Sequence, residues 1–265
     1  MSEDPNIKRD ANKLEDEDFI RYKLFEDKKS LLQKYADLVI GSGSLFKLIK
    51  YEFLTTLLGP VPGATGLLMR KLFYPMLFQH MGKGVSIGRS VTIRHPAKIK
   101  LGRRVVIDDY CLIDARGAGG EGINIGREVF IGRGAIIQSK VGPISIGDRT
   151  NIGAGTAIIA QGSGIYIDKM VTIAGGCSIS GGAYQVGRGN DLTREHDKYT
   201  QGPIRIDRKC RLGMGAMVLD NVHINEGTII GAKSLVTEDL PEFCVAAGIP
   251  AKVRYSRDKV PEKNR

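Results

Sequence analysis

The sequence of 265 residues contains no tryptophan, and only 6% of its residues are aromatic. Because aromatic side chains supply much of the volume of a broad core, their scarcity favours a narrow interior lined by isoleucine and valine. The four cysteines lack the C-x-x-C spacing of zinc and redox sites. We therefore expect neither a metal centre nor a disulfide framework.

Long apolar runs are also missing. The first ten residues, MSEDPNIKRD, lack the apolar segment of a signal peptide. No uninterrupted apolar stretch reaches the roughly 18 residues that a transmembrane helix requires. The sequence therefore predicts a cytoplasmic protein, with peripheral contact at the inner face of the membrane as an alternative.

The charge is uneven along the chain. The net charge is +10, yet residues 1–30 carry nine acidic and seven basic side chains, so the positive excess lies in the rest of the chain. A basic surface aids solubility, or it binds an anionic partner such as a phosphorylated cofactor, a lipid head group or nucleic acid. No pattern of basic and aromatic residues indicates nucleic-acid binding, so we expect no nucleic-acid partner.

The clearest pattern is a six-residue repeat over residues 206–236. An aliphatic residue returns at every sixth position, and four places after each of the first five comes a small residue. The aliphatic positions are Ile206, Leu212, Val218, Ile224, Ile230 and Val236. Neither a helix nor a simple strand has this period, whereas each hexad of a parallel β-helix forms one short strand and corner.

The same register extends back to Met81. It groups 21 aliphatic positions in threes, which predicts seven triangular coils. Every insertion falls after the third position of a coil, so all insertions leave from one edge of the prism. Three cysteines occupy the small interior positions of this register, namely Cys111, Cys177 and Cys210. A free thiol there behaves as a small apolar group.

The sequence divides into 1–80, 81–240 and 241–265. The first part holds a charged arm and a helical region, the second the β-helix with a long loop at 180–205, and the third a cap and tail. Residues 31–80 contain three apolar helical segments, broken near Gly41–Ser44 and Gly59–Gly63. These segments either pack on the β-helix or a neighbouring subunit, or anchor the protein at an anionic membrane.

The loop at 180–205 adds 21 residues to its coil and contains His196. A long excursion adds no stability to a solenoid, and chemistry tends to lie on loops of a rigid scaffold. The other histidines, His80, His95 and His223, lie outside this loop. A neutral imidazole can remove a proton from a hydroxyl at neutral pH. We therefore expect His196 to be a general base, without a covalent enzyme intermediate.

The hexads, together with T-R-E-H-D at 193–197 and A-A-G-I-P-A-K at 246–252, resemble the hexapeptide-repeat acetyltransferases. The nearest branch includes the galactoside, maltose and xenobiotic acetyltransferases and the O-acetyltransferases of surface polysaccharides. The resemblance implies a left-handed parallel β-helix, a homotrimer, and acetyl-CoA bound in clefts between subunits. It matches the family's catalytic histidine to His196. The acceptor would be a hydroxyl of a sugar or polysaccharide precursor, free or carried on a lipid.

The resemblance also implies cofactor-binding residues. It places the pantetheine arm against main chain near the ends of two coils and the cofactor phosphates near the closing motif. The matching residues are Gly213, Met214, Gly215, Gly231, Ala232, Thr237, Lys252 and Arg254. Backbone N–H groups near Gly213–Gly215 are candidates for oxyanion stabilisation. Two positions depart from the family, where an aromatic residue often stands at Arg211 and a lysine at Glu238.

Other functions are open on the sequence. A γ-type carbonic anhydrase shares the fold but needs clustered histidines, which this sequence lacks. A non-enzymatic scaffold or membrane adaptor would not need the long histidine-containing loop. Within the transferase interpretation, an amino-sugar acceptor or a longer acyl donor is equally compatible with the residues.

Overall fold

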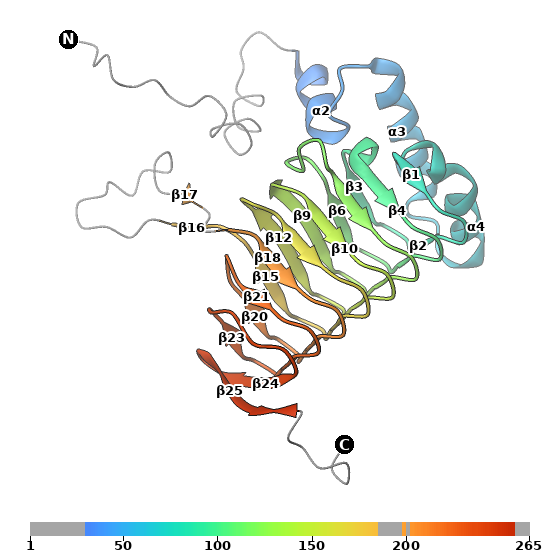
Figure 1. Ribbon diagram of the computed structural model, residues 1–265. Helices are drawn as coiled ribbons and strands as arrows, with labels where there is room; N and C mark the ends of the chain where they lie inside the picture. Colours follow the sequence, from blue (N-terminus) through green and yellow to red (C-terminus); the bar gives the residue numbers. More distant parts are fainter. Residues whose placement is uncertain (1–29, 185–197, 200–201, 258–265) are drawn as a thin grey trace, which may run out of the picture.

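The computed structural model describes residues 30–184, 198–199 and 202–257. Three parallel sheets run the length of a triangular β-helix, and short helices cover its N-terminal end (Figure 1). Seven coils each contribute one strand to each sheet, as the hexad register predicts. The predicted arm, residues 1–29, and the tail from residue 258 lie outside the described residues.

The three sheets are numbered in the order in which the chain enters them. Sheet 1 contains β1 (His80–Met81), β4 (Ile99–Leu101), β7 (Ile123–Ile125), β10 (Ile144–Ile146), β13 (Ile165–Ile167), β18 (Ile204–Ile206) and β21 (His223–Ile224). Sheet 2 contains β2 (Ser86–Ile87), β5 (Val106–Ile107), β8 (Phe130–Ile131), β11 (Asn151–Ile152), β14 (Thr172–Ile173), β19 (Arg211–Leu212), β22 (Ile229–Ile230), β24 (Cys244–Gly248) and β25 (Ala251–Ser256). Sheet 3 contains β3 (Thr92–Arg94), β6 (Leu112–Asp114), β9 (Ile136–Val141), β12 (Ala157–Gln161), β15 (Ser178–Ser180), β20 (Met217–Val218) and β23 (Leu235–Val236).

The aliphatic ladder confirms the predicted register. Ile107 pairs with Ile131 in sheet 2, and Ile206 pairs with Ile224 in sheet 1. All the predicted aliphatic positions are buried except Met81, which is partly buried in the first coil. The hydrophobic core is therefore the lumen of the prism.

The cysteines occupy the small interior positions. All four are free and buried, and the thiol of Cys177 donates to the carbonyl of Gly213 at 3.2 Å. Burial raises the pKa of the Cys111 thiol to about 11 and that of the Cys210 thiol to about 12. These thiols are therefore protonated at neutral pH and act as packing groups.

Three edges join the sheets. Edge 1 leads from sheet 1 to sheet 2, edge 2 from sheet 2 to sheet 3, and edge 3 from sheet 3 to the sheet 1 strand of the next coil. The insertions all leave from edge 3, including the short 3-10 helix η2 (Pro96–Lys98) and the long segment between β15 and β18. This arrangement confirms the prediction that the insertions share one edge.

Four helical segments precede or join the first coil. They are α2 (Leu31–Val39), α3 (Leu45–Leu58), α4 (Gly63–Phe73) and the 3-10 helix η1 (Tyr74–Met76). Ser30 caps α2 with a capping box, and Ser44 is the N-cap residue of α3. Among the described helices, none is both long and apolar enough to cross a membrane.

Buried polar contacts fix these helices to the coils. The Tyr51 hydroxyl of α3 donates to the carbonyl of Ile93 at 2.6 Å. His95 is buried and shares a 2.8 Å hydrogen bond with the carbonyl of Asp37 through Nε2. Burial lowers the pKa of His95 to about 4, so this imidazole is neutral and structural.

The prediction for the face of α3 needs correction. The sequence places Leu48 on the same apolar side as Leu45, Ile49, Phe53 and Leu57. In the structure Leu48 is buried with Tyr51, Leu54 and Leu58, whereas the other four predicted residues are more than half exposed. The helix is apolar around most of its circumference, so periodicity alone does not identify the side that packs on the coils.

Candidate functional site

The predicted base, His196, lies outside the described residues, between two short strands. β16 (Ala183–Tyr184) and β17 (Lys198–Tyr199) pair antiparallel, with Ala183 opposite Tyr199. The two strands come from the long insertion and lie beside the coils near β18 (Figure 1). The histidine therefore belongs to an excursion that starts and ends at edge 3.

Side chains of the neighbouring coils support the base of this excursion. Gln161 donates to the Ser180 hydroxyl at 3.3 Å. Gly202, just before β18, lies against Asn221, and a Cβ at residue 202 would lie 2.2 Å from the Asn221 Oδ1 atom. A side chain at residue 202 would therefore have to displace the Asn221 amide. The point where the chain returns to the prism is thus fixed by close packing.

A row of polar side chains along edge 3 of the first three coils was not predicted from the sequence. Arg94, Asp114 and Gln138 stack in register on consecutive coils. The Asp114 carboxylate is buried, and it accepts bonds from Arg116 at 2.6 Å and Gln138 at 3.0 Å. A charged residue directly after the aliphatic Ile113 is the signal that could have revealed it. Since the carboxylate is fully paired, this row stabilises the insertion and does not supply a base.

The predicted pantetheine-binding residues come together on edge 2. Gly213 and Gly231 begin the corners of the last two coils, and a Cβ at Gly213 would lie 2.6 Å from the backbone nitrogen of Ala232. The Met214 side chain is 65% exposed, and Ala232 is exposed beside it. Stacking of the coils thus requires glycine at residue 213. The result is a corner of low relief on which a thin ligand could lie.

The oxyanion role of the backbone N–H groups near Gly213–Gly215 stays a prediction, although two of these groups already have partners. The N–H of Gly213 donates to the carbonyl of Ile230 at 2.9 Å, and that of Gly215 donates to the carbonyl of Gly175 at 3.1 Å. Both donors are engaged in the bonds that hold neighbouring coils together. They could reach an oxyanion only by giving up these bonds.

The remaining predicted cofactor residues lie at the C-terminal end of the prism. Thr237 is exposed directly after β23, and Lys252 lies in the cap strand β25. The Lys252 ammonium forms a 3.0 Å ion pair with Glu238, in which both side chains are more than half exposed. Arg254 donates to the carbonyl of Ala247 at 3.1 Å. One predicted phosphate ligand is thus paired with the acid that stands where the family often has lysine.

The loop and the glycine corner lie on opposite margins of sheet 3. The chain passes through edge 2 over the six residues from Leu212 in β19 of sheet 2 to Val218 in β20 of sheet 3, and it leaves sheet 3 at edge 3. The long excursion and the glycine corner therefore lie on different edges of the prism.

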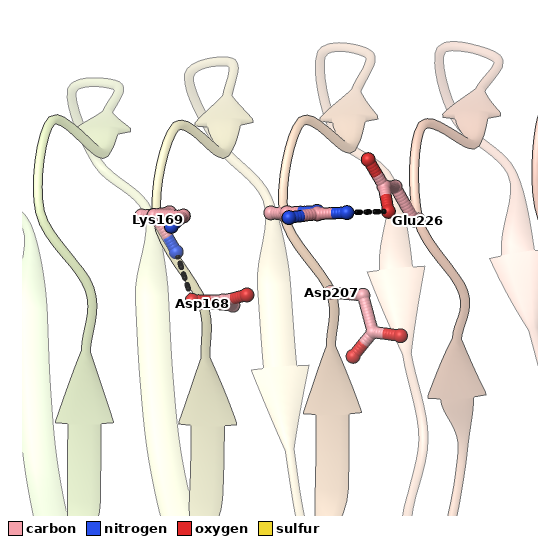
Figure 2. Close-up of a pocket in the computed structure, with 5 residues that line it drawn as sticks. Asp168, Lys169, Asp207 and Glu226 are labelled. Atoms are coloured by element: carbon pink, nitrogen blue, oxygen red, sulfur yellow. Dashed lines mark hydrogen bonds and ion pairs between the residues drawn. The ribbon is translucent and has the colours of Figure 1, made fainter.

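Edge 1 carries a separate polar hollow of about 280 Å³. Figure 2 shows its acids on successive coils, with Asp168 and Lys169 on one, Asp207 on the next and Glu226 after it. Arg208 and Glu226 form a 2.7 Å ion pair, which lowers the pKa of the carboxyl. The hollow includes none of the predicted site residues, and these paired charges link neighbouring coils.

None of the three described histidines, His80, His95 and His223, belongs to a cluster of metal ligands. His223 lies 3.1 Å from Asp207 on the outer side of sheet 1. Within residues 30–184, 198–199 and 202–257, no group of three or more histidine, cysteine, aspartate or glutamate side chains could hold a metal ion. The described residues thus give no support to the carbonic anhydrase alternative.

One curated relative aligns with most of the chain. The chain is 30% identical over 187 residues to dTDP-4-amino-4,6-dideoxy-D-glucose acyltransferase of Escherichia coli. The alignment covers 69% of this chain and 85% of that enzyme. It is 33% identical over 115 residues to serine acetyltransferase 2 of Arabidopsis thaliana, covering 43% of this chain and 33% of that protein. The second match therefore spans about a third of the plant enzyme.

Solved structures share the fold. A variant of AntD, an N-acyltransferase from Bacillus cereus in complex with dTDP and coenzyme A, matches with a TM-score of 0.50 and 22% identity, covering 69% of this chain and 86% of that chain. No protein-family model matches the sequence.

Proposed function

The chain belongs to the hexapeptide-repeat acyltransferases, and we propose that it transfers an acetyl group from acetyl-CoA to a hydroxyl group of a sugar. The alignment with the E. coli sugar acyltransferase carries the acyl-transfer part of this proposal, because it covers 85% of that enzyme; the choice of a hydroxyl acceptor rests on the sequence resemblance to the O-acetyltransferases. The long excursion at edge 3 and the flat corner at edge 2 support it. Together they offer a place for a base and a place for a thin thioester ligand.

The reaction follows general-base chemistry. His196 removes the proton of the acceptor hydroxyl, and the oxygen attacks the thioester carbonyl of acetyl-CoA. The tetrahedral intermediate collapses with cleavage of the carbon–sulfur bond, and the imidazolium returns the proton to the departing thiolate. The acetyl group is then an ester of the sugar, and free coenzyme A leaves.

The cofactor would lie along edge 2 of the last two coils. Met214, Ala232 and Lys233 have exposed side chains there. Met214 and Ala232 would border the pantetheine arm, while Gly213, Gly215 and Gly231 leave room for it. Thr237 would lie alongside the thioester end. Lys252 and Arg254 would approach the phosphates, since both extend from the cap below this corner.

A homotrimer would complete this site. Apolar residues recur on the outer face of sheet 3 among polar ones such as Thr92, Gln138 and Ser178, and they include Leu112, Ile136, Ala157, Ile159, Met217 and Leu235. The outward residues of sheet 1 are mostly polar, including Lys100, Asn124, Arg205 and His223. A cyclic trimer built around sheet 3 would bring edge 3 of one protomer next to edge 2 of another.

Transfer to an amino group of a nucleotide-linked sugar is the second candidate. It is favoured by the name of the E. coli relative, whose substrate carries a 4-amino group. The same base and the same cofactor position would serve, with a sugar nitrogen in place of the hydroxyl oxygen.

A single assay tests both candidates. Purified protein is incubated with acetyl-CoA and either hydroxylated sugars or dTDP-4-amino-4,6-dideoxyglucose, and thiol release and the mass of the product are measured. An acetyl product that hydroxylamine cleaves is an ester, whereas a resistant product is an amide. Failure to release thiol with any acceptor, together with no thermal stabilisation by coenzyme A, would support the scaffold alternative instead.

A further inference from the structure

The outward side of α3 is an exposed apolar stripe. Leu45, Ile49, Phe53 and Leu57 follow one another at four-residue spacing, so they lie on one side of the helix. Their exposed fractions range from 55% to 61%, and that of the neighbouring Phe46 is 77%. The opposite side of α3 is buried on the first coil, so this stripe faces away from the β-helix.

The neighbouring helical segments also expose large apolar residues. α4 and η1 expose five large apolar residues, and α2 exposes three more. These residues are Leu67, Leu68, Leu72, Phe73 and Met76, with Leu31, Leu32 and Tyr35. We name these eight residues and the five of α3 the helical apolar face. Such a concentration of exposed leucine and phenylalanine within fewer than 50 residues is unusual for a surface in contact with water alone.

Lysines lie beside this face. Lys50 follows Phe46 by four residues and precedes Phe53 by three, so its side chain lies next to both rings. Its ammonium donates to the carbonyl of Met76 at 2.9 Å, which holds it at the margin between α3 and η1. Lys71 is exposed and stands four residues after Leu67 on α4.

The acidic side chains of this region do not offset the lysines fully. Residues 31–80 contain four lysines, one buried arginine and two acids. One acid, Glu52, accepts a 2.6 Å hydrogen bond from Tyr35. The surface thus combines apolar side chains with an excess of positive charge.

We propose that the helical apolar face binds the surface of an anionic phospholipid bilayer. Leucine and phenylalanine would enter the boundary between head groups and acyl chains, while lysines at the margins would contact anionic head groups. A second copy of the same face would bring lysines of like sign together across a symmetric contact, so the charge favours a lipid surface over self-association. The inference goes beyond the acyl-transfer proposal and does not depend on it.

Vesicle flotation of the full-length protein tests the proposal. One set of vesicles is neutral phosphatidylcholine, and the other contains about 30 mol% phosphatidylserine. We expect the protein to float with the anionic vesicles, to float much less with the neutral ones, and to lose binding as salt is raised. Phe46→Ser combined with Phe53→Ser should lower the bound fraction about tenfold or more. Lys47 is exposed and directly follows Phe46 on α3, and Lys47→Glu combined with Lys71→Glu should abolish the preference for anionic lipid.

A matched control removes exposed apolar side chains elsewhere. Val106→Ser combined with Phe130→Ser changes two partly exposed residues on the outer side of sheet 2, and it should leave flotation unchanged. All variants are also compared by thermal unfolding, so that loss of fold is separated from loss of binding. Three results would overturn the proposal, namely no flotation of the wild-type protein, equal flotation of the phenylalanine variant, or self-association that this variant abolishes.

Discussion

At the scale of single residues, the account depends most on His196. The residue lies outside the described part of the chain, yet it belongs to the insertion whose ends pair as β16 and β17. We predict that His196→Ala lowers turnover by about 10² to 10⁴-fold, because general-base catalysis typically contributes that much. Steady-state kinetics with acetyl-CoA measures the effect.

The control for this prediction is His80→Ala. His80 is exposed in β1, at the far end of the prism from the cap, and its replacement should leave turnover unchanged. Binding of coenzyme A, measured by calorimetry, should survive in both variants. Turnover close to the wild-type value in His196→Ala would show that another group acts as the base.

The ion pair of Lys252 with Glu238 gives a second prediction. The pair is exposed, and exposed pairs contribute little free energy, so Lys252 can exchange its partner for a phosphate. Glu238→Gln should remove this competition and lower KM for acetyl-CoA, by up to about fivefold. Lys252→Met should raise KM for acetyl-CoA. When Glu238→Gln is added to the Lys252→Met variant, KM should not fall. An unchanged KM in both single variants would remove Lys252 from the phosphate site.

The buried thiols predict how stability depends on pH. The folded-state pKa values of Cys111 and Cys210, about 11 and about 12, lie above the ordinary thiol value. Between the ordinary value and these raised values, the unfolded chain releases protons that the folded chain retains. The free energy of unfolding should therefore fall as pH rises above about 9, by up to about 1.4 kcal/mol per pH unit for each thiol.

Urea unfolding at several pH values measures this dependence. Cys111→Ala combined with Cys210→Ala removes the two thiols, and alanine already fills an equivalent interior position at Ala216. The variant should lose stability less steeply with pH than the wild-type protein does. Parallel curves for the two proteins would count against the thiols as the cause.

Residue-scale prediction from the sequence succeeded where one repeat dictates the environment. The interior position of Cys210 follows from the hexad register, which the coils impose on every turn. The pairing of Lys252 with Glu238 could not be predicted, because it depends on how the cap strand folds back beside the last coil. The bonds that engage Gly213 and Gly215 likewise depend on contacts between coils.

At the scale of elements, Arg70 links the helices to the β-helix. Its side chain is only 1% exposed, and it donates to the carbonyls of Leu58, Val61 and Ile87 at 2.7 to 2.8 Å. These bonds satisfy carbonyl groups at the end of α3, in the turn before α4, and in strand β2. The sequence suggested that Arg70 flanks an apolar segment, and the structure shows that it is a buried tie.

We predict that Arg70→Met destabilises the protein by about 3–5 kcal/mol, because it leaves buried carbonyl groups without donors. Lys71→Met is the matched control on the same helix. Lys71 is exposed, so its replacement should change stability by no more than about 0.5 kcal/mol. Urea unfolding compares the two variants, and equal stabilities would show that Arg70 is not a structural tie.

The coils were predictable as elements, whereas the orientation of the helices was not. A coil repeats one pattern at every turn, so each hexad adds support for the same register. Helix α3 has apolar residues on both sides, and the inner side is decided by the fit of Leu48 and Leu54 to the first coil. The hairpin of β16 and β17 has no hexad signal, so its pairing could not be read from the repeat.

At the scale of the whole molecule, the two ends of the prism have different surfaces. The helical apolar face lies at the N-terminal end, and the proposed cofactor corner lies near the cap (Figure 1). A cyclic trimer of parallel prisms would place three helical apolar faces on one side. A membrane on that side would leave the three proposed sites facing away from it.

The proposed trimer rests on the surface of sheet 3. The sequence resemblance implies a trimer, and the outward apolar residues of sheet 3 support this sheet as the surface for it. Within one protomer, sheet 3 lies between edge 3, which carries the long loop, and edge 2, which carries the glycine corner. We therefore propose that the loop of one protomer meets the glycine corner of another. The central claim is therefore a site shared between protomers.

Subunit complementation tests this claim most directly. His196→Ala removes the proposed base, and Ala232→Trp places a bulky ring on the exposed corner proposed for the cofactor. Each variant alone should be nearly inactive in acetyl-CoA-dependent transfer. Random mixed trimers made by co-expression in equal amounts should recover about a quarter of the wild-type activity, because one site in four combines an intact loop with an intact corner. Mixed trimers with no more activity than the two separate variants would contradict a shared site.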